Sequence, residues 1–229
     1  MLTPSTLVVL GVVASLSLNR AVASPAALHA FTADYQANYM GMQANGTMTL
    51  TAASNHQWDY TFVIQNQLAT LKQSTHFEEH AAQLRPLSSN DLSALLVKRR
   101  EVKTQYNWDT HQATWSGDIK PNRRGPIQLQ EGDMDGLLLN LAIVRDVAAN
   151  RPLNYRMVDE GRVKNLQYTV QGKETLMVNG KQTQATKVAE HDGSKEIIAW
   201  VVADVPVPVR LLQRTNGQDT LELTLSAFH

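Results

Sequence analysis

Apolar and polar residues alternate with a period of two along much of the chain from Phe31 onward. The clearest run spans residues 31–39, and similar runs follow at 47–52, 58–64 and 69–77. This period is typical of strands that bury one face in an antiparallel sheet. Gly41 and Asn45-Gly46 supply turn or bulge chemistry between the first two runs. The pattern therefore predicts a meander of strands, as in a sandwich or a barrel.

Two departures from the alternation stand in the middle of the chain. Pro86, within Leu84-Arg85-Pro86-Leu87, is expected to break the ladder because proline has no amide hydrogen to donate. Later the period changes to that of a helix over residues 135–149, with Asp133 or Asp135 as the cap. The apolar face of this helix is broad, so we expect it to pack against a sheet.

The last third returns to strands, separated by turn sequences at 159–161, 179–180, 192–193 and 216–217. No repeat or linker divides the chain. The expected fold is mainly β: a single antiparallel, strongly curved sheet, a half-barrel, with one covering helix.

The N-terminal residues have the pattern of a secretory signal peptide. An apolar run at 7–14 is followed by Ala21-Val22-Ala23, a small-residue cleavage site, ahead of Ser24-Pro25. The alternative is an uncleaved anchor, but the run is about half of the roughly 20 residues that span a bilayer. We predict a cleavable signal at 1–23, one β-rich domain at 24–229 and no stable membrane span.

Composition excludes several classes of chemistry. The chain has no cysteine, which removes disulfides, thiolate nucleophiles and Cys-ligated metals. Lys+Arg and Asp+Glu are both 21, so nothing in the overall charge calls for a nucleic-acid partner. The basic cluster Lys98-Arg99-Arg100 has no recognition motif beside it and is expected to be a solvated face.

One segment matches a metallopeptidase signature. His76, Glu79 and His80 fit H-x-x-E-H, which needs a helix to bring both imidazoles onto one zinc ion. The flanking residues alternate as in a strand, where positions four apart lie roughly 13 Å from each other. We therefore expect no metal site and no cofactor. A zinc hydrolase that uses these residues is the least favoured hypothesis.

Short motifs across the chain resemble an uncharacterised family of exported Gram-negative proteins, a domain of unknown function. They are Leu84-Arg85-Pro86, Tyr106-Asn107-Trp108-Asp109, Asp133-Met134-Asp135-Gly136-Leu137, Gly172-Lys173-Glu174, Asn179-Gly180-Lys181 and Trp200 with Pro206-Val207-Pro208-Val209. The resemblance implies a periplasmic location and a distant likeness to the LolA/LolB half-barrel, which carries lipoprotein acyl chains. It supplies no catalytic residues.

These observations leave two main hypotheses. The first is a non-enzymatic periplasmic protein of the cell envelope that binds a lipid, an acyl chain or another apolar ligand on the concave face of the sheet. Its candidate lining residues are Tyr35, Tyr39, Trp58, Phe62, Trp108, Leu137 and Leu141. The second is an envelope scaffold with a solid core that binds another envelope protein. A cavity of several hundred Å³ between helix and sheet would favour the first, and a close-packed interior would favour the second.

Overall fold

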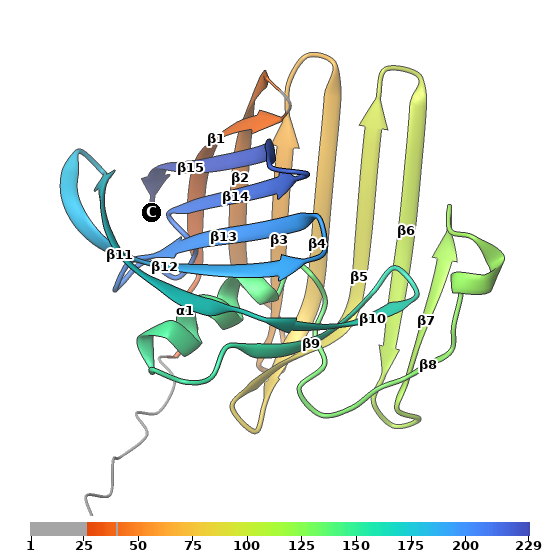
Figure 1. Cartoon of the computed structure of the whole chain (residues 1–229). Helices are drawn as coiled ribbons and strands as arrows, with labels where there is room; N and C mark the ends of the chain where they lie inside the picture. Colours follow the sequence, from red (N-terminus) through yellow and green to blue (C-terminus); the bar gives the residue numbers. More distant parts are fainter. Residues whose placement is uncertain (1–26, 40) are drawn as a thin grey trace, which may run out of the picture.

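The fold is built around one large antiparallel sheet (Figure 1). The computed structural model describes residues 27–39 and 41–229, so the predicted signal peptide at 1–23 lies outside the described residues. The sheet has 13 strands in the order β11-β12-β13-β14-β15-β1-β2-β3-β4-β5-β6-β7-β8. The strands are β1 (Phe31–Tyr39), β2 (Met42–Ala52), β3 (Gln57–Gln65), β4 (Ala69–His80), β5 (Gln83–Leu95), β6 (Lys98–Asn107), β7 (Gln112–Gly117), β8 (Ile127–Gln128), β11 (Thr169–Val178), β12 (Lys181–Asp192), β13 (Lys195–Val201), β14 (Arg210–Thr215) and β15 (Gln218–Phe228).

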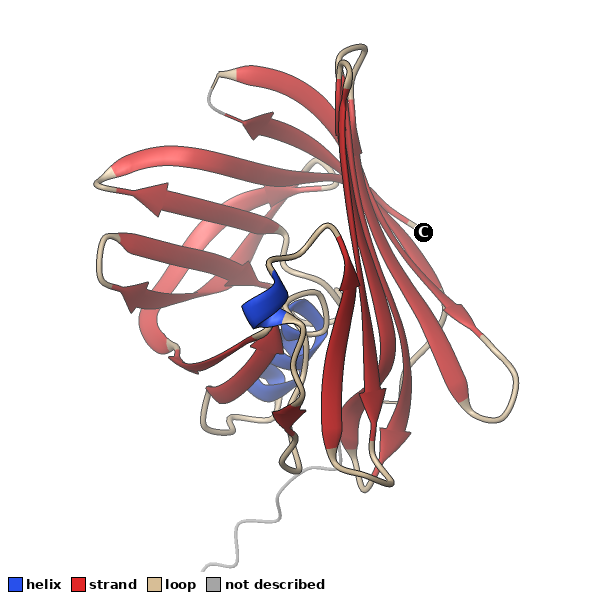
Figure 2. Ribbon diagram, turned by 90° about the vertical axis from the view of Figure 1, so that its right-hand side faces the viewer, coloured by secondary structure: helices blue, strands red, loops and turns tan. Residues whose placement is uncertain are grey.

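The sheet is strongly bent, so that its two halves face each other (Figure 2). Strands β2–β7 form one half, here the N-terminal wall, and β11–β15 form the other, the C-terminal wall. Strand β1 joins them, because it pairs with β2 on one side and with β15 on the other. Within the described residues the edge strands β8 and β11 do not pair with each other, and the sheet stays open. The predicted half-barrel is confirmed.

A second layer covers the concave side of the sheet. It contains helix α1 (Leu139–Ala148) and a separate hairpin, β9 (Asn154–Asp159) with β10 (Arg162–Gln167). A parallel bridge between Met134 and Met157 ties the chain ahead of the helix to this hairpin. A short 3₁₀-helix, η1 (Pro121–Arg123), lies in the connection from β7 to β8. The predicted covering helix is present. The turn at 159–161 was also predicted, but the sequence pattern did not indicate that the β9–β10 hairpin would leave the main sheet and form a second covering element.

The helix begins later than its sequence pattern predicted. A tight turn over residues 136–138 precedes α1, and Asp135 Oδ1 accepts a 2.9 Å hydrogen bond from the amide of Leu138. Asp135 thus caps this turn, while Asp133 accepts from the amide of Gln130 and pairs with Arg156 of β9. The predicted range of 135–149 therefore merged a capped turn with the helix.

Two expected breaks in the strands were wrong. Asn45-Gly46 lies inside β2, where a β-carbon on Gly46 would come within 3.3 Å of Tyr35. Pro86 lies inside β5 and pairs with Phe77, next to a bulge that shifts the β4–β5 register. Pairing of β5 with β6 begins only at Ser88, so the missing amide hydrogen of Pro86 costs no bond on that side.

Candidate functional site

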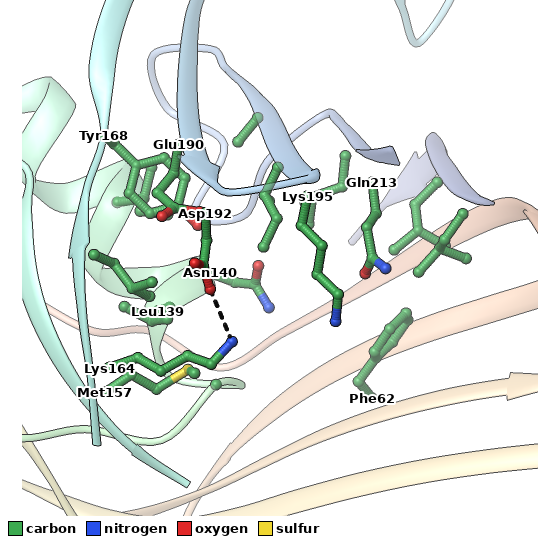
Figure 3. A pocket seen from close by; sticks show the side chains of 18 of the residues that line it. Phe62, Leu139, Asn140, Met157, Lys164, Tyr168, Glu190, Asp192, Lys195 and Gln213 are labelled. Atoms are coloured by element: carbon green, nitrogen blue, oxygen red, sulfur yellow. Dashed lines mark hydrogen bonds and ion pairs between the residues drawn. The ribbon is translucent and has the colours of Figure 1, made fainter. Parts of the chain in front are cut away.

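A cavity of about 230 Å³ lies between α1, the β9–β10 hairpin and the two walls of the sheet (Figure 3). We call the space between these elements the cleft. Its lining is mainly aliphatic, with Phe62 on the N-terminal wall and polar groups at the edge. The lining residues are Met48, Phe62, Gln73, Gly136, Leu139, Asn140, Ile143, Met157, Lys164, Leu166, Tyr168, Glu190, Asp192, Lys195, Ile197, Ala199, Leu211, Gln213, Leu221 and Leu223.

The period of each element explains which residues reach the cleft. On α1 the spacing of three to four residues places Leu139 and Ile143 on one face, with Asn140 beside them. On the C-terminal wall every second residue faces inward, as Leu221 and Leu223 do on β15. The cleft is therefore produced by regular helix and strand geometry, and its shape is set by the bend of the sheet.

Charged side chains gather where the cleft meets the β12–β13 turn. Lys164 Nζ lies 3.2 Å from Asp192 Oδ2, and Lys195 is on the same side (Figure 3). Glu190 is buried nearby, and burial raises its pKa above the usual range, with Asp192 adding to the effect. This end of the cleft is thus polar, whereas its interior is apolar.

A second cavity, of about 320 Å³, continues the cleft along the N-terminal wall. Both cavities are lined by Phe62, Gln73 and Leu221, so they adjoin. The second is more polar in character. Gln73 donates to Asp91 over 3.1 Å, and Arg100 pairs with Glu160 of the β9–β10 turn over 2.7 Å.

Three carboxyl groups are held between the N-terminal wall and the covering layer. Burial, together with the nearby Asp91 and Asp135, raises the pKa of Asp159 to about 7. Burial raises the pKa of Asp135 to about 6, although hydrogen bonds from Thr75 and Leu138 oppose the shift. The pKa of Asp91 is also raised, mainly by burial. The second cavity, which Asp91 and Asp159 line, can therefore change its charge near neutral pH.

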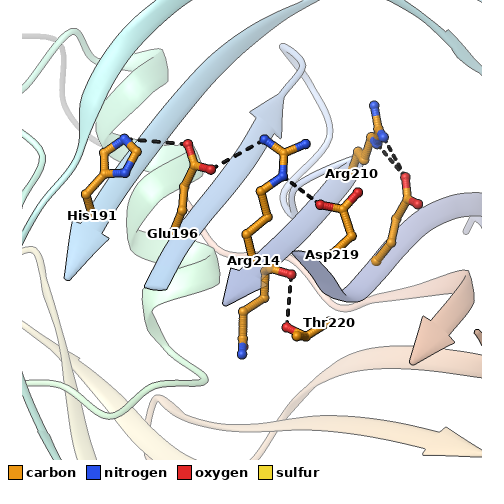
Figure 4. Close-up of polar contacts among 8 residues, drawn as sticks. His191, Glu196, Arg210, Arg214, Asp219 and Thr220 are labelled. Carbon is orange, nitrogen blue, oxygen red and sulfur yellow. Dashed lines mark hydrogen bonds and ion pairs between the residues drawn. The ribbon is translucent and has the colours of Figure 1, made fainter. Parts of the chain in front are cut away.

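The opposite face of the C-terminal wall carries a row of ion pairs (Figure 4). His191 lies 3.5 Å from Glu196, which pairs with Arg214 over 3.4 Å. Arg214 also pairs with Asp219 over 2.6 Å, so the row crosses β12, β13, β14 and β15. Since His191 lies between Glu190 and Asp192, which line the cleft, strand alternation directs it away from the cleft. These charges support the sheet and do not belong to the cavity.

Phe62 is the predicted lining residue that borders both cavities. Tyr35, Leu137 and Leu141 lie in the main core instead, and Tyr35 donates a 2.8 Å hydrogen bond to the carbonyl of Pro208. Tyr39 is exposed at the end of β1. Only Phe62 of this group reaches the cleft.

The two predicted tryptophans lie on other surfaces. Trp58 is half-buried against the main core. Trp108 donates from Nε1 to the carbonyl of Pro86 over 2.7 Å, and the Arg85 guanidinium lies 5.3 Å from its ring centroid. Neither side chain borders the cleft.

His76 and His80 both lie on β4, which confirms that this segment is a strand. The two ring nitrogens of His76 contact Asp59 at 2.8 Å and Gln57 at 3.0 Å, while His80 is exposed at the strand end. Across residues 27–39 and 41–229, no cluster of three or more His, Cys, Asp or Glu side chains is placed to hold a metal ion.

Most cleft residues were not among the sequence candidates. The candidates were chosen largely as aromatic, whereas the C-terminal wall presents aliphatic residues such as Ile197 and Leu223. The available signal was the alternation in that part of the chain, where Leu221, Leu223 and Leu225 follow one another at period two.

A family model described as "Protein of unknown function (DUF3108)" matches residues 34–224. The chain belongs to the DUF3108 family. Among curated proteins none matches the sequence. The match agrees with the resemblance to an uncharacterised family, and the likeness to LolA stays a prediction.

Solved structures are similar to this DUF3108 protein at low sequence identity. One is a beta-barrel-like protein of the DUF1849 domain of unknown function from Brucella abortus, with a TM-score of 0.55 and 10% identity over 87% of this chain and 97% of that one. Another is the MucA/MucB complex of Pseudomonas aeruginosa, with a TM-score of 0.39 and 8% identity over 87% of this chain and 51% of that one. The DUF3108 chain thus spans about half the length of that second match.

The cleft combines an apolar interior with polar groups at its edges, which is the usual composition of a small-molecule site.

In the described part of the chain, no helix is long and apolar enough to cross a membrane.

Proposed function

We propose that this DUF3108 protein is a non-enzymatic periplasmic protein that binds an apolar or lipid-like ligand in the cleft and serves in maintenance of the cell envelope. The observation that carries the proposal is the aliphatic cavity enclosed by α1, the β9–β10 hairpin and the bent sheet. A close-packed interior would have filled this space. Export rests on the predicted signal peptide at 1–23.

The two adjoining cavities suggest the chemistry of the ligand. An apolar tail fits beside Leu139, Ile143 and Leu223, where it would gain free energy by leaving water. A polar group fits toward Gln73, Asp91 and Arg100, which can hydrogen-bond it. A fatty acid or another single-chain amphiphile has both parts.

The proposal predicts a measurable complex. Native mass spectrometry of gently purified protein is expected to show a bound lipid, and adding a dansylated fatty acid to stripped protein should raise its melting temperature. Gln213 points into the cleft (Figure 3), so Gln213→Trp would fill part of the cavity and weaken fatty-acid binding at least about tenfold.

The same substitution at a nearby position provides the control. Gln218 belongs to the same β14–β15 hairpin but is exposed and lies outside the cleft, so Gln218→Trp should bind as the unmodified protein does. If the unmodified protein carries no lipid and gains no thermal stability from the dansylated fatty acid, the proposal of ligand binding in the cleft fails. A scaffold role then becomes the better explanation.

A further inference from the structure

Exposed apolar side chains are concentrated at one end of the molecule. Seven of the ten large hydrophobic residues that are exposed in the described structure lie on three neighbouring hairpins, β1–β2, β3–β4 and β5–β6. The seven are Tyr39, Met42, Leu68, Leu71, Leu95, Leu96 and Val97. Alternate turns of an antiparallel meander lie at the same end, and the β3–β4 and β5–β6 tips form the upper extremity of the N-terminal wall in Figures 1 and 2, whereas the β1–β2 tip curves toward the C-terminal wall. We call this group the apolar tips.

The β5–β6 turn is the most unusual of these tips. Leu96 is 75% exposed and Val97 is fully exposed at 104%, in a two-residue loop closed by the pair Leu95 and Lys98. The φ of Leu96 is +49°, a left-handed conformation that disfavours leucine. Elsewhere in the chain, the equivalent loop positions Asn179 and Asn216 have φ of +49° and +52° and use the residue that tolerates them. Leucine at this position serves neither packing nor turn formation.

The tips are held in fixed positions relative to each other. The amide of Leu96 donates to the carbonyl of Leu68 over 3.1 Å, which joins the β5–β6 turn to the β3–β4 turn. Asn66 Oδ1 accepts from the amides of Leu68 and Ala69, and its side-chain nitrogen donates to Gln43 of β2. The exposed apolar side chains are therefore presented by a connected backbone.

Positive charge borders the tips. The hairpin ends at residues 63–72 and 92–101, which lie at the same level of the sheet, contain four cations, Lys72, Lys98, Arg99 and Arg100, and one acidic residue, Glu101. Arg100 pairs with Glu160 and Arg99 reaches Glu101, whereas Lys98 forms no salt bridge with any residue that the structure describes. Apolar side chains that protrude beyond a basic border match the interface of an anionic bilayer, where the tips enter the apolar region and the cations meet lipid phosphates.

We infer that the apolar tips dock this protein onto the surface of an anionic phospholipid membrane. A second copy fits this surface poorly, since a symmetric tip-to-tip contact would bring Lys98 and Arg99 of both copies together. The location also matters, because Leu71 of the apolar tips and Arg100 of the basic border also line the second cavity of the cleft. Docking in this orientation places that opening close to the lipid.

The test is co-sedimentation of the full-length mature protein with vesicles of pure phosphatidylcholine and with vesicles containing phosphatidylglycerol. We expect binding to the anionic vesicles that weakens as salt is added, since screening reduces attraction between surface charges. The double variant Leu96→Asn/Val97→Ser should bind at least about tenfold more weakly, because two apolar side chains no longer enter the bilayer. Lys98→Gln/Arg99→Gln should lose about fivefold for each charge.

Three controls separate docking from other causes. The Leu96→Asn/Val97→Ser variant should melt at or above the temperature of the unmodified protein, since Asn suits the positive φ. Met177→Gln removes an exposed apolar side chain from β11 of the C-terminal wall and should leave vesicle binding unchanged. Gln213→Trp, which blocks the cleft, should also bind vesicles normally, so a failure of ligand binding and a failure of docking can be told apart.

Two results would overturn the inference. One is vesicle binding that is the same for the unmodified protein and the Leu96→Asn/Val97→Ser variant. The other is a dimer in light scattering that this variant converts to a monomer, which would make the apolar tips a contact between copies.

Discussion

The buried carboxyl group of Asp135 should make the protein less stable as pH rises. Its pKa in the folded state is about 6, against an ordinary value of 3.8, because burial disfavours the charged form. One pKa unit corresponds to about 1.4 kcal/mol, so ionising the folded group costs about 3 kcal/mol in full. Because the folded pKa is the higher one, the folded protein holds more protons between these two values. The stabilising effect is complete below about pH 4 and is lost as pH rises through about 6.

The substitution Asp135→Asn removes this titration with little change in shape. The amide oxygen can still accept from Leu138, and the amide nitrogen can donate to the hydroxyl of Thr75. Urea unfolding at about pH 4 and about pH 8 should show the variant gaining about 2 kcal/mol over the unmodified protein between those pH values. Removing this charge also lowers the pKa of Asp159, which adds to the gain in the same direction.

A matched control is available on the surface. Asp109 is an exposed residue in the β6–β7 turn, and Asp109→Asn changes the net charge by the same amount without removing a buried group. Its stability relative to the unmodified protein should stay nearly constant with pH. If the difference between Asp135→Asn and the unmodified protein does not grow with pH, burial of Asp135 does not set its ionisation, and the reasoning is refuted.

Two further substitutions test contacts of the covering layer and the core, both by urea unfolding. Arg156→Ala should destabilise the protein by about 3 kcal/mol, because it leaves the Asp133 carboxylate buried without its cation. The double variant Asp133→Asn/Arg156→Ala should recover part of this loss. If the single and double variants lose the same stability, the buried charge is not the cause. Tyr35→Phe should cost about 1 kcal/mol through loss of the hydrogen bond to Pro208 while leaving fatty-acid binding unchanged, and a change in binding would instead place Tyr35 at the ligand site.

Local sequence signals were sufficient to predict several individual strands and turns. The alternation over residues 31–39 matches the bounds of β1, and the Asn-Gly pairs at 179–180 and 216–217 are turns. These features depend on neighbouring residues, whose chemistry is visible in one segment. The helix was also visible, although a capped turn was merged with its start.

Features that depend on pairing between segments were not predictable in this way. Pro86 fits within β5 because β5 itself bulges beside it, at Leu87, and because β6 pairs only farther along, which no local pattern reveals. Similarly, alternation shows that Leu223 shares a face with Leu221, but only the bend of the sheet determines that this face meets Phe62 across the cleft. Tyr35 and Trp108 were candidates because aromatic side chains are large, but their positions in the folded chain lie outside the cleft.

The pairing of β1 with β15 has a consequence for how the chain folds. Most strand contacts join neighbours in sequence, so each wall can form as a local meander with low loop-closure entropy. The β1–β15 ladder, in contrast, joins Ala33 to Phe228 and Tyr39 to Leu221, at opposite ends of the described chain. Long-range pairing of this kind slows folding, because the closure entropy is lost before the contacts form. Until this ladder forms, β1 and β15 are open sheet edges. The folding intermediate is therefore most prone to edge-to-edge association in that interval.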